Sequence, residues 1–324
     1  MEEKLKAPDV RASQRHKQLM KELKWLEPDL INLQEVETSH FSVLADELGQ
    51  LGFQGVHKVH YEEQHGLATF YKTERFEMEK SVSRHFNKLM SKIFKEDQFV
   101  DKNKHNERIV LFSHFSDRKT GRSIVVANLH SMFNSWREPD KQALQITVFL
   151  RELHEFLTSE GHGKDENIPW IISGDFNTYP NFPLYNIIAT GNVSDEDIEK
   201  LNPNKYLYPQ IIQKSETSNI KTLILEKGRK YLSHPLRDIK SAYKTALGKE
   251  PSLTHYQMNK EFPRLYGFEV MKGTLDYIWY SSATLGVNAV LRNVKEESLK
   301  ALVACPNKYF PSDHLSMKAC FGYS

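Results

Sequence analysis

Four short blocks of the sequence carry carboxylate, amide or imidazole side chains at positions where they could perform phosphate chemistry. The blocks are LINLQEVE, ISGDFNTYP, GTLDYIWY and PSDHLSM, and their polar residues of interest are Glu35, Asp175, Asn177, Asp276, Asp313 and His314. In three of the four blocks these residues lie at or just past the end of an apolar, β-branched run, so they could converge at one sheet edge. Carboxylates that are brought together repel one another, and a hard cation held by oxygen atoms offsets that repulsion. The blocks therefore indicate a Mg²⁺ site with a histidine beside it, which suits phosphate-ester hydrolysis.

Each of these residues also has an ordinary structural interpretation. Glu35 could be a carboxylate at a strand end that backbone amides satisfy, and Asp175 with Asn177 could form an Asx-turn. If the segment after the strand stays extended, Asp175 and Asn177 point the same way and could hold a water beside a phosphate. Asp276 could cap a buried strand, or it could orient His314 and raise its pKa, so that an imidazolium faces the phosphate. The residues alone leave these alternatives open.

With LQE, GDFN, DYI and SDH in this order, the chain resembles the endonuclease/exonuclease/phosphatase superfamily, which has the DNase I-like fold. Residues 65–78, 174–188 and 275–281 are similar to the deadenylase-related branch. That branch includes the carbon-catabolite-repressor-type deadenylases, nocturnin, the 2′-phosphodiesterases and the angel proteins, and NFPLYNII is most similar to the angel proteins. The resemblance implies a four-layer α/β sandwich with two packed mixed sheets. It also implies that Glu35 binds Mg²⁺ directly, that Mn²⁺ can substitute, and that Asp313 lies on the metal side through water.

The resemblance further assigns the catalytic roles. It implies that Asp175 and Asn177 handle the attacking water and the phosphate, and that Asp276 orients His314 at the scissile phosphate. His130, which ends VVANLH, would contact the phosphate, although Leu129 departs from the NTH motif that is usual in the branch. The other twelve histidines are expected to lie outside the site. The implied activity is that of a Mg²⁺-dependent phosphodiesterase that hydrolyses RNA from a 3′ end, as an exoribonuclease or deadenylase-like enzyme does.

Two departures from the family pattern favour alternatives to this activity or to this substrate. The family's first strand, with a motif like SYNIL and an asparagine near the metal, has no counterpart in the sequence, so the protein could be a catalytically impaired RNA-binding or scaffold protein. We expect a version extended by that strand to be more active and more stable. Deadenylases place an aromatic residue that helps hold adenine where this sequence reads EVMKGTLD, with Met271 and Lys272, which weakens a strict poly(A) preference. Alternative substrates are an RNA 2′,3′-cyclic phosphate, a 2′-5′ oligonucleotide and a dinucleotide phosphate.

Alternating strand and helix patterns predict the elements that position these blocks. Strands are predicted over 30–36, 68–71, 109–115, 123–129, 168–173, 275–280, 287–291 and 315–321, and helices over 13–26, 41–51 and 139–157. In this pattern Glu35 ends a strand at the edge of a sheet. Such a sequence fits two sheet layers flanked by helices, in a single domain over 1–324.

Two basic stretches look like insertions into this pattern. Residues 80–108 have a local net charge of about +4 and residues 212–250 of about +5, counting Lys and Arg against Asp and Glu. They could be solvated surface, or they could form a rim that follows the phosphates of RNA. The aromatic residues that could stack on bases, or could instead belong to the core, are Tyr256, Phe262, Tyr266 and Phe268.

Composition excludes several classes of protein. The net charge is +2, from 44 basic and 42 acidic residues, so the overall charge does not indicate a partner. Cys305 and Cys320 are the only cysteines, which excludes a disulfide framework and a zinc-cysteine pattern and fits a reducing compartment. No apolar run reaches the ~18 residues that span a bilayer. We therefore expect a monomer in the cytoplasm, with the nucleus or mitochondria as alternatives, that acts on RNA and not at a membrane; the sequence does not indicate a protein partner.

Overall fold

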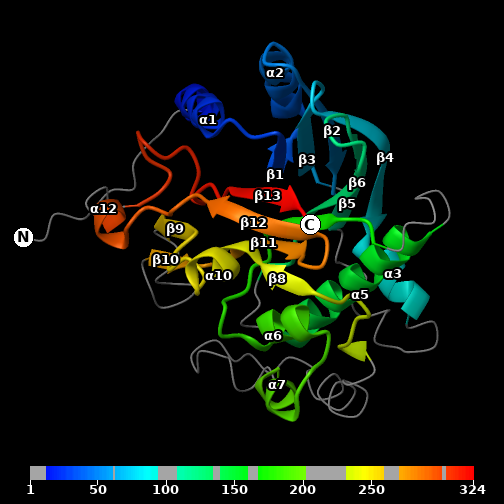
Figure 1. Cartoon of the computed structure of the whole chain (residues 1–324). Coiled ribbons are helices and arrows are strands. Elements are labelled where there is room, and N and C mark those ends of the chain that lie inside the picture. The colour runs from blue at the N-terminus through cyan, green and yellow to red at the C-terminus, as the bar shows by residue number, and fades with distance from the viewer. Residues whose placement is uncertain are drawn as a thin grey trace, which may run out of the picture.

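A six-stranded mixed sheet lies at the centre of the molecule (Figure 1). The computed structural model describes residues 12–60, 63–93, 108–133, 139–159, 167–201, 231–258, 270–300 and 304–324. In order across the sheet, the strands are β4 (Phe76–His85), β5 (Ile109–Asp117), β6 (Ser123–His130), β7 (Trp170–Asp175), β11 (Asp276–Ser281) and β8 (Ile239–Ser241). Neighbouring strands are antiparallel except β6 and β7, which run parallel. This parallel pair places two strand ends at the same edge of the sheet.

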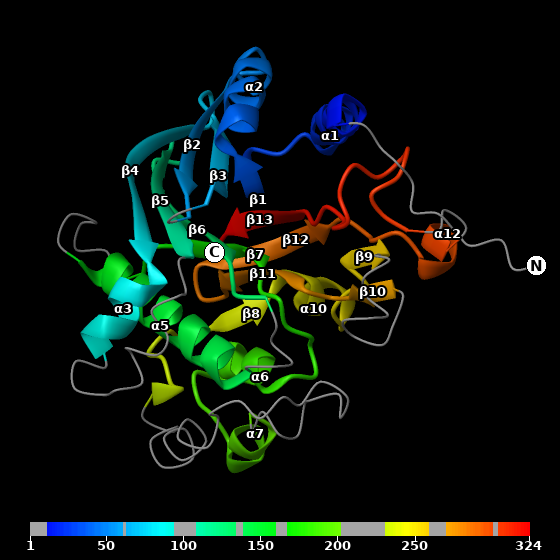
Figure 2. The same ribbon diagram turned by 180° about the vertical axis from the view of Figure 1, so that it is seen from behind.

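Two smaller antiparallel sheets pack against one face of the central sheet (Figures 1 and 2). One has the strand order β1 (Leu30–Glu37), β3 (His65–Lys72) and β2 (Phe53–Val59), and the other pairs β12 (Leu285–Val290) with β13 (Ala319–Tyr323). Between the layers, Phe115 and Tyr280 of the central sheet contact Tyr71 from β3 and Phe321 from β13. Within the described residues, β1, β2, β12 and β13 each pair with a strand on one side only.

Helices cover the outer faces of both sheet layers. The central sheet is covered by α3 (Phe86–Ile93), α5 (Pro139–Thr158) and α6 (Pro183–Thr190), and α1 (Ala12–Leu26) and α2 (Thr38–Gly49) lie beside β1, β2 and β3. On α5, Phe149 and Phe156 stack on Phe112 of β5 with ring centroids 5.9 and 5.2 Å apart. Both faces of β5 and β6 are therefore buried, which explains their nearly continuous apolar sequences. The succession of helices, sheet, sheet and helices confirms the predicted DNase I-like α/β sandwich.

The remaining elements are each no longer than six residues. They are α7 (Asp195–Lys200), α10 (Ala242–Leu247), β9 (His255–Met258), β10 (Val270–Gly273) and α12 (Glu296–Lys300). β9 and β10 form a separate antiparallel pair, and β9 is bridged to the chain at His314. Among the described helices, none combines the length and the apolar character that a membrane span requires.

Every strand and helix predicted from the sequence is present, with ends shifted by up to a few residues. Among the described elements, the sequence did not predict the strands β2, β4, β8, β9 and β10 or the helices α3, α6, α7, α10 and α12. Most exposed positions of β2 and β4 carry polar or charged side chains, and the irregular burial of β2 breaks the alternation that marks a half-buried strand. Pairing with β3 and β5, which are far better buried, supplies the hydrogen bonds that make them strands.

The described part of the first basic stretch comprises residues 80–93, which belong to β4 and α3, and Arg108, which directly precedes β5. Phe86 of this part is completely buried in the main core. Arg84 and Lys92 lie 2.8 and 3.3 Å from carboxylate oxygens of Glu152 on α5, so part of the positive charge is paired within the fold. Residues 94–107 and 212–230 of the two stretches lie outside the described residues.

Of the four aromatic residues that could stack on bases, Tyr256 alone lies within the described residues. Tyr256 on β9 is 5% exposed and packs in a cluster with Leu253 and Leu315, so it belongs to the core. Phe262, Tyr266 and Phe268 lie outside the described residues.

Candidate active site

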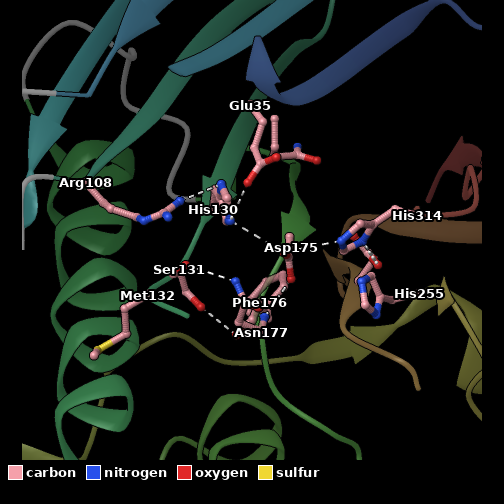
Figure 3. A network of polar contacts seen from close by, with 12 residues as sticks. Glu35, Arg108, His130, Ser131, Met132, Asp175, Phe176, Asn177, His255 and His314 are labelled. Atoms are coloured by element: carbon pink, nitrogen blue, oxygen red, sulfur yellow. Dashed lines mark hydrogen bonds and ion pairs between the residues drawn. The ribbon is translucent and has the colours of Figure 1, made fainter. Parts of the chain in front are cut away.

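The ends of three neighbouring strands place His130, Asp175 and Asp276 in one row. His130 is the last residue of β6, Asp175 is the last of β7, and Asp276 is the first of β11. The strand register pairs His130 with Asp175 across the parallel step and Asp175 with Asp276 across the antiparallel step. Residues far apart in the sequence therefore lie side by side at one edge of the sheet, as Figure 3 shows for His130 and Asp175.

Gly174 allows β7 to approach β6 closely at this edge. Its φ is +147°, and a Cβ added to it would lie 1.9 Å from the carbonyl oxygen of Leu129. Any side chain at this position would push the two strands apart and move Asp175 away from His130. The glycine before Asp175 is thus a packing requirement of the site.

Glu35 reaches the same edge from the other layer, at a β-bulge and not at the strand end that the sequence predicts. β1 continues to Glu37, and its pairing with β3 is interrupted between Leu33 and Val36. Glu35 has a φ of +57°, a left-handed conformation that costs a non-glycine residue about 1–3 kcal/mol. Its side chain is 68% exposed, and Oε1 lies 4.0 Å from Nε2 of His130. The bulge thus re-aims the carboxylate toward the row of strand ends.

Asn128 ties this bulge to β6. Its Oδ1 accepts a 2.7 Å hydrogen bond from Nε2 of Gln34, and its Nδ2 donates to the carbonyl oxygens of Leu33 at 3.1 Å and Ala68 at 2.9 Å. Asn128 is buried, so these bonds form away from water, where an unsatisfied amide would be costly. The positions of Glu35 and of the end of β6 are therefore coupled through one side chain.

Asp175 and Asn177 form an Asx-turn, which corrects the expectation that this segment stays extended with both side chains on one side. The backbone N–H of Asn177 donates to Oδ1 of Asp175 at 2.7 Å, and Asn177 has a φ of +49°. Nδ2 of Asn177 donates to the carbonyl oxygen of Ser131 at 3.2 Å. The hydrogen bond within the turn stabilises this conformation relative to an extended one, as is common for Asx residues after a strand. The turn still keeps Asn177 next to the end of β6.

Asp175 is a buried carboxylate between two histidines. Its Oδ2 lies 3.5 Å from Nε2 of His130 and 3.9 Å from Nε2 of His314. Burial raises the pKa of Asp175 to about 7; the charge on His314 opposes this rise, whereas Asp276 and Glu35 add to it. A carboxylate with such a pKa can exchange a proton near neutral pH.

His314 and Asp276 form the carboxylate–imidazole pair that the sequence predicts. Nδ1 of His314 lies 2.8 Å from Oδ2 of Asp276, and the same oxygen accepts a 2.6 Å hydrogen bond from Oγ1 of Thr254. Burial by itself would lower the pKa of His314, but the Asp276 carboxylate raises it to about 10, with help from Asp175 and Asp313. The ring is therefore an imidazolium at neutral pH, with Nε2 directed to the Asp175 side (Figure 3).

His130 has an arginine as its partner, which the sequence analysis did not single out. Nη1 of Arg108 lies 2.6 Å from Nδ1 of His130 (Figure 3). Burial lowers the pKa of His130 well below its usual value, and the Arg108 charge lowers it further. Arg108 directly precedes β5 within a run of charged residues, and no local pattern distinguishes it from its neighbours.

His255 lies against His314, whereas the sequence analysis expected it to lie outside the site. The two ring centroids are 4.6 Å apart, and Nε2 of His255 lies 3.7 Å from Oδ2 of Asp313. Burial alone would raise the pKa of Asp313, but His255 and the charge on His314 lower it to about 2. Nitrogen and oxygen atoms of these three residues lie within 4.8 Å of one another. A polar THY segment at the start of β9 was the only local signal for His255.

Two glutamines of α5 form hydrogen bonds with the backbone segments that directly follow β6 and β7. Nε2 of Gln142 lies 2.9 Å from the carbonyl oxygens of Phe176 and Asn177, and Oε1 of Gln145 accepts a 2.8 Å hydrogen bond from the N–H of Met132. The sequence analysis missed both residues, although glutamines on the apolar face of a buried helix are an informative exception. They fix the segments that follow β6 and β7, and so support the geometry of the site.

The donor set fits a divalent cation bound mainly by oxygen. Glu35 offers an exposed carboxylate. Repulsion by the carboxylates of Asp276 and Glu35 adds to the rise in the pKa of Asp175, and a bound cation would relieve that repulsion. Mg²⁺ commonly takes one or two protein carboxylates and keeps several waters. Asp313 lies with His255 and His314, in a group whose nitrogen and oxygen atoms could themselves hold a cation.

Comparisons with known proteins show which proteins the chain is similar to. The Ccr4 subunit of Schizosaccharomyces pombe, a 3′-5′-exoribonuclease of the CCR4-Not complex, is 25% identical over 336 residues that cover 94% of this chain and 44% of that protein. Ccr4 of Debaryomyces hansenii is 27% identical over 322 residues, covering 94% of this chain and 34% of that protein. The chain thus spans less than half the length of these curated relatives.

Solved structures extend the likeness to the whole fold. ANGEL2, a 2′,3′-cyclic phosphatase crystallised with adenosine-2′,3′-vanadate, has a TM-score of 0.73 and 25% identity, over 96% of this chain and 86% of that chain. The human Nocturnin catalytic domain has the same fold, with a TM-score of 0.60 and 20% identity over 97% and 88% of the two chains. These relatives confirm the resemblance to the deadenylase-related branch. The profile of the Endonuclease/Exonuclease/phosphatase family matches residues 4–314, and the chain therefore belongs to that family.

Proposed function

We propose that this protein is a Mg²⁺-dependent phosphodiesterase that hydrolyses RNA at a 3′ end. The observation that carries the proposal is the row of His130, Asp175 and Asp276, with His314 bonded to Asp276 and facing Asp175. A buried carboxylate flanked by two imidazole groups is suited to activate water beside a phosphate. The similarity to Ccr4, a 3′-5′-exoribonuclease, supports RNA as the substrate class.

In the proposed reaction, water attacks the phosphorus atom as the bond from phosphorus to the leaving ester oxygen breaks. Asp175 accepts the proton of the attacking water, a role that its pKa of about 7 favours. Asn177 supports the water and the phosphate, and the His314 imidazolium donates a hydrogen bond to a phosphate oxygen that gains negative charge. The N–H of His130 contacts the phosphate from the other side of Asp175.

Glu35 would hold the metal ion directly, and Asp313 would contact it through water. A bound Mg²⁺ or Mn²⁺ would supply Lewis-acid stabilisation of the phosphate charge. The protein's own contribution is to aim these carboxylates, and the bulge at Glu35 together with its link through Asn128 serves that purpose.

A second candidate is hydrolysis of an RNA 2′,3′-cyclic phosphate. The likeness to ANGEL2, which is a 2′,3′-cyclic phosphatase, favours it specifically. The same residues can serve both reactions, because in each of them water attacks phosphorus and one P–O bond opens. The two reactions differ in the leaving oxygen, which belongs to a neighbouring nucleotide in the first reaction and to the same ribose in the second.

One experiment separates these functions. A labelled RNA of one sequence is prepared with a 3′-hydroxyl, a 3′-phosphate or a 2′,3′-cyclic phosphate, and each form is incubated with the protein in Mg²⁺, in Mn²⁺ and in EDTA. Shortening of the 3′-hydroxyl RNA supports the exonuclease, and opening of the cyclic phosphate without shortening supports the second candidate. Asp175→Asn serves as the inactive control. Absence of turnover on every RNA in both metals would refute the proposal and favour a non-catalytic RNA-binding protein.

A further inference from the structure

The partner of His130 determines which of its ring nitrogens carries a proton. Nη1 of Arg108 lies 2.6 Å from Nδ1 of His130. A guanidinium can only donate hydrogen bonds, so Nδ1 must be the acceptor. In a neutral imidazole the single proton then resides on Nε2. This Nε2 faces the site, 3.5 Å from Oδ2 of Asp175 and 4.0 Å from Oε1 of Glu35.

The other histidine of the site has the opposite arrangement. Nδ1 of His314 donates to the carboxylate of Asp276 at 2.8 Å, and Nε2 lies 3.9 Å from the same oxygen of Asp175 that faces His130. A carboxylate at Nδ1 favours a ring that is protonated on both nitrogens, whereas an arginine at Nδ1 excludes a proton there. The two rings on either side of Asp175 therefore differ at Nδ1, which accepts a hydrogen bond in His130 and donates one in His314, although both direct Nε2 to Asp175.

A second buried histidine near Arg108, His60, also accepts a hydrogen bond at Nδ1, as His130 does. His60 lies beside His130 with ring centroids 6.2 Å apart, and its Nδ1 accepts a 3.2 Å hydrogen bond from the backbone N–H of Ile109. Residues 108 and 109, at the start of β5, thus present donors to the Nδ1 atoms of two adjacent buried histidines. Both rings are set with the proton on Nε2, so positive charge does not accumulate on this side of the site.

We propose that Arg108 is a positioning residue for the hydrolysis: it holds the His130 ring in the Nε2–H tautomer, so that an Nε2–H donor contacts the phosphate from the side of Asp175 opposite His314. The proposal rests on the proposed function. In the other tautomer Nε2 would carry no proton and could not donate a hydrogen bond to a phosphate oxygen. The Arg108 donor at Nδ1 therefore fixes the ring nitrogen that faces the site as a donor.

The test compares Arg108→Met, which removes the donor, with Arg108→Lys, which keeps one. Histidine rings are labelled with ¹⁵N, and the His130 signals are identified by their loss in His130→Gln. We expect the parent to carry a proton on Nε2 only, Arg108→Met to gain a proton on Nδ1, and Arg108→Lys to resemble the parent. For hydrolysis we expect Arg108→Met to lose about 10²-fold in kcat, the scale of a lost transition-state donor, with Arg108→Lys recovering most of it.

Arg118→Met is the matched control, because Arg118 pairs with Glu77 through two half-exposed side chains. It should change neither the ring signals nor kcat, and a thermal midpoint for each variant excludes unfolding as the cause. A proton on Nδ1 of His130 in the parent, or unchanged His130 signals in Arg108→Met, would overturn the proposal. The ring measurement needs no substrate, so it still decides the role of Arg108 at His130 if no RNA is hydrolysed and the proposed function fails.

Discussion

The pairing of Asp276 with His314 allows a prediction whose size can be worked out. Asp276→Asn replaces a carboxylate by an amide of the same shape, so its oxygen can still accept from Nδ1 of His314 and from Thr254. The substitution removes the negative charge that raises the pKa of His314 to about 10. Without that charge the pKa of His314 should fall toward the 6.5 of an unperturbed histidine. The alkaline limit of activity should therefore move to lower pH.

The magnitude follows from the fraction of imidazolium. At pH 8 a ring with a pKa of about 10 is ~99% protonated, whereas a ring at 6.5 is only ~3% protonated. At pH 6 the variant ring is still about three-quarters protonated. The imidazolium fraction of His314 by itself therefore predicts a ratio of parent to variant kcat/KM that rises from near one at pH 6 to roughly 30 at pH 8. Asp276 also helps to raise the pKa of Asp175, so the acid limit of the variant should move to lower pH as well.

The assay measures initial rates of labelled RNA hydrolysis in excess Mg²⁺ across pH 5 to 9 for both proteins. Asp238→Asn, at an exposed position outside the site, is the control for loss of one negative charge. A parent-to-variant ratio that stays constant between pH 6 and pH 8 would refute the assignment of His314 as an imidazolium maintained by Asp276. A proton NMR titration of His314 in the two proteins tests the same pKa change without substrate.

Three further predictions concern the metal and the groups around it. EDTA should abolish hydrolysis, and excess Mg²⁺ or Mn²⁺ should restore it. A zinc-selective chelator should have no effect, because the proposed ligands are oxygen atoms. Full activity in EDTA would contradict an oxygen-bound cation. Glu35→Ala and Asp175→Ala should each lower kcat by more than ~10³ without loss of the folded state by circular dichroism, and kcat within about tenfold of the parent removes that residue from the mechanism. Asn177→Gly keeps the left-handed backbone but loses the side-chain amide, so its kcat should fall ~10²–10³-fold. Asn177→Val should add ~1–3 kcal/mol of backbone strain, so its thermal midpoint should lie below that of Asn177→Gly. Equal midpoints for the two variants would argue against that strain.

Local patterns predicted the elements that carry the site because the relevant signals are short. Apolar, β-branched runs identified the strands around Glu35, Asp175 and Asp276, and helical spacing identified the long helix over residues 139–158. Where the pattern was weak, as in β2 and β4, the strands depend on neighbours from elsewhere in the chain. The bulge at Glu35 was missed, and the Asx-turn at Asn177 stayed one of two alternatives, for a related reason. Both are local departures from regular strand geometry, and periodicity does not encode them.

By itself, the sequence determined which polar residues stand at the strand ends and in what order, because a strand end and its turn involve only a few consecutive residues. Tertiary structure alone decided which other side chains join them. Arg108 reaches His130, His255 packs on His314, and Gln142 reaches the segment after β7 only through the pairing and stacking of distant strands and helices. The charge of each histidine depends on the same contacts, since one Nδ1 faces a carboxylate and the other an arginine. A residue's type sets its chemistry, but its pKa and its tautomer are set by neighbours that only the folded chain brings within hydrogen-bond distance.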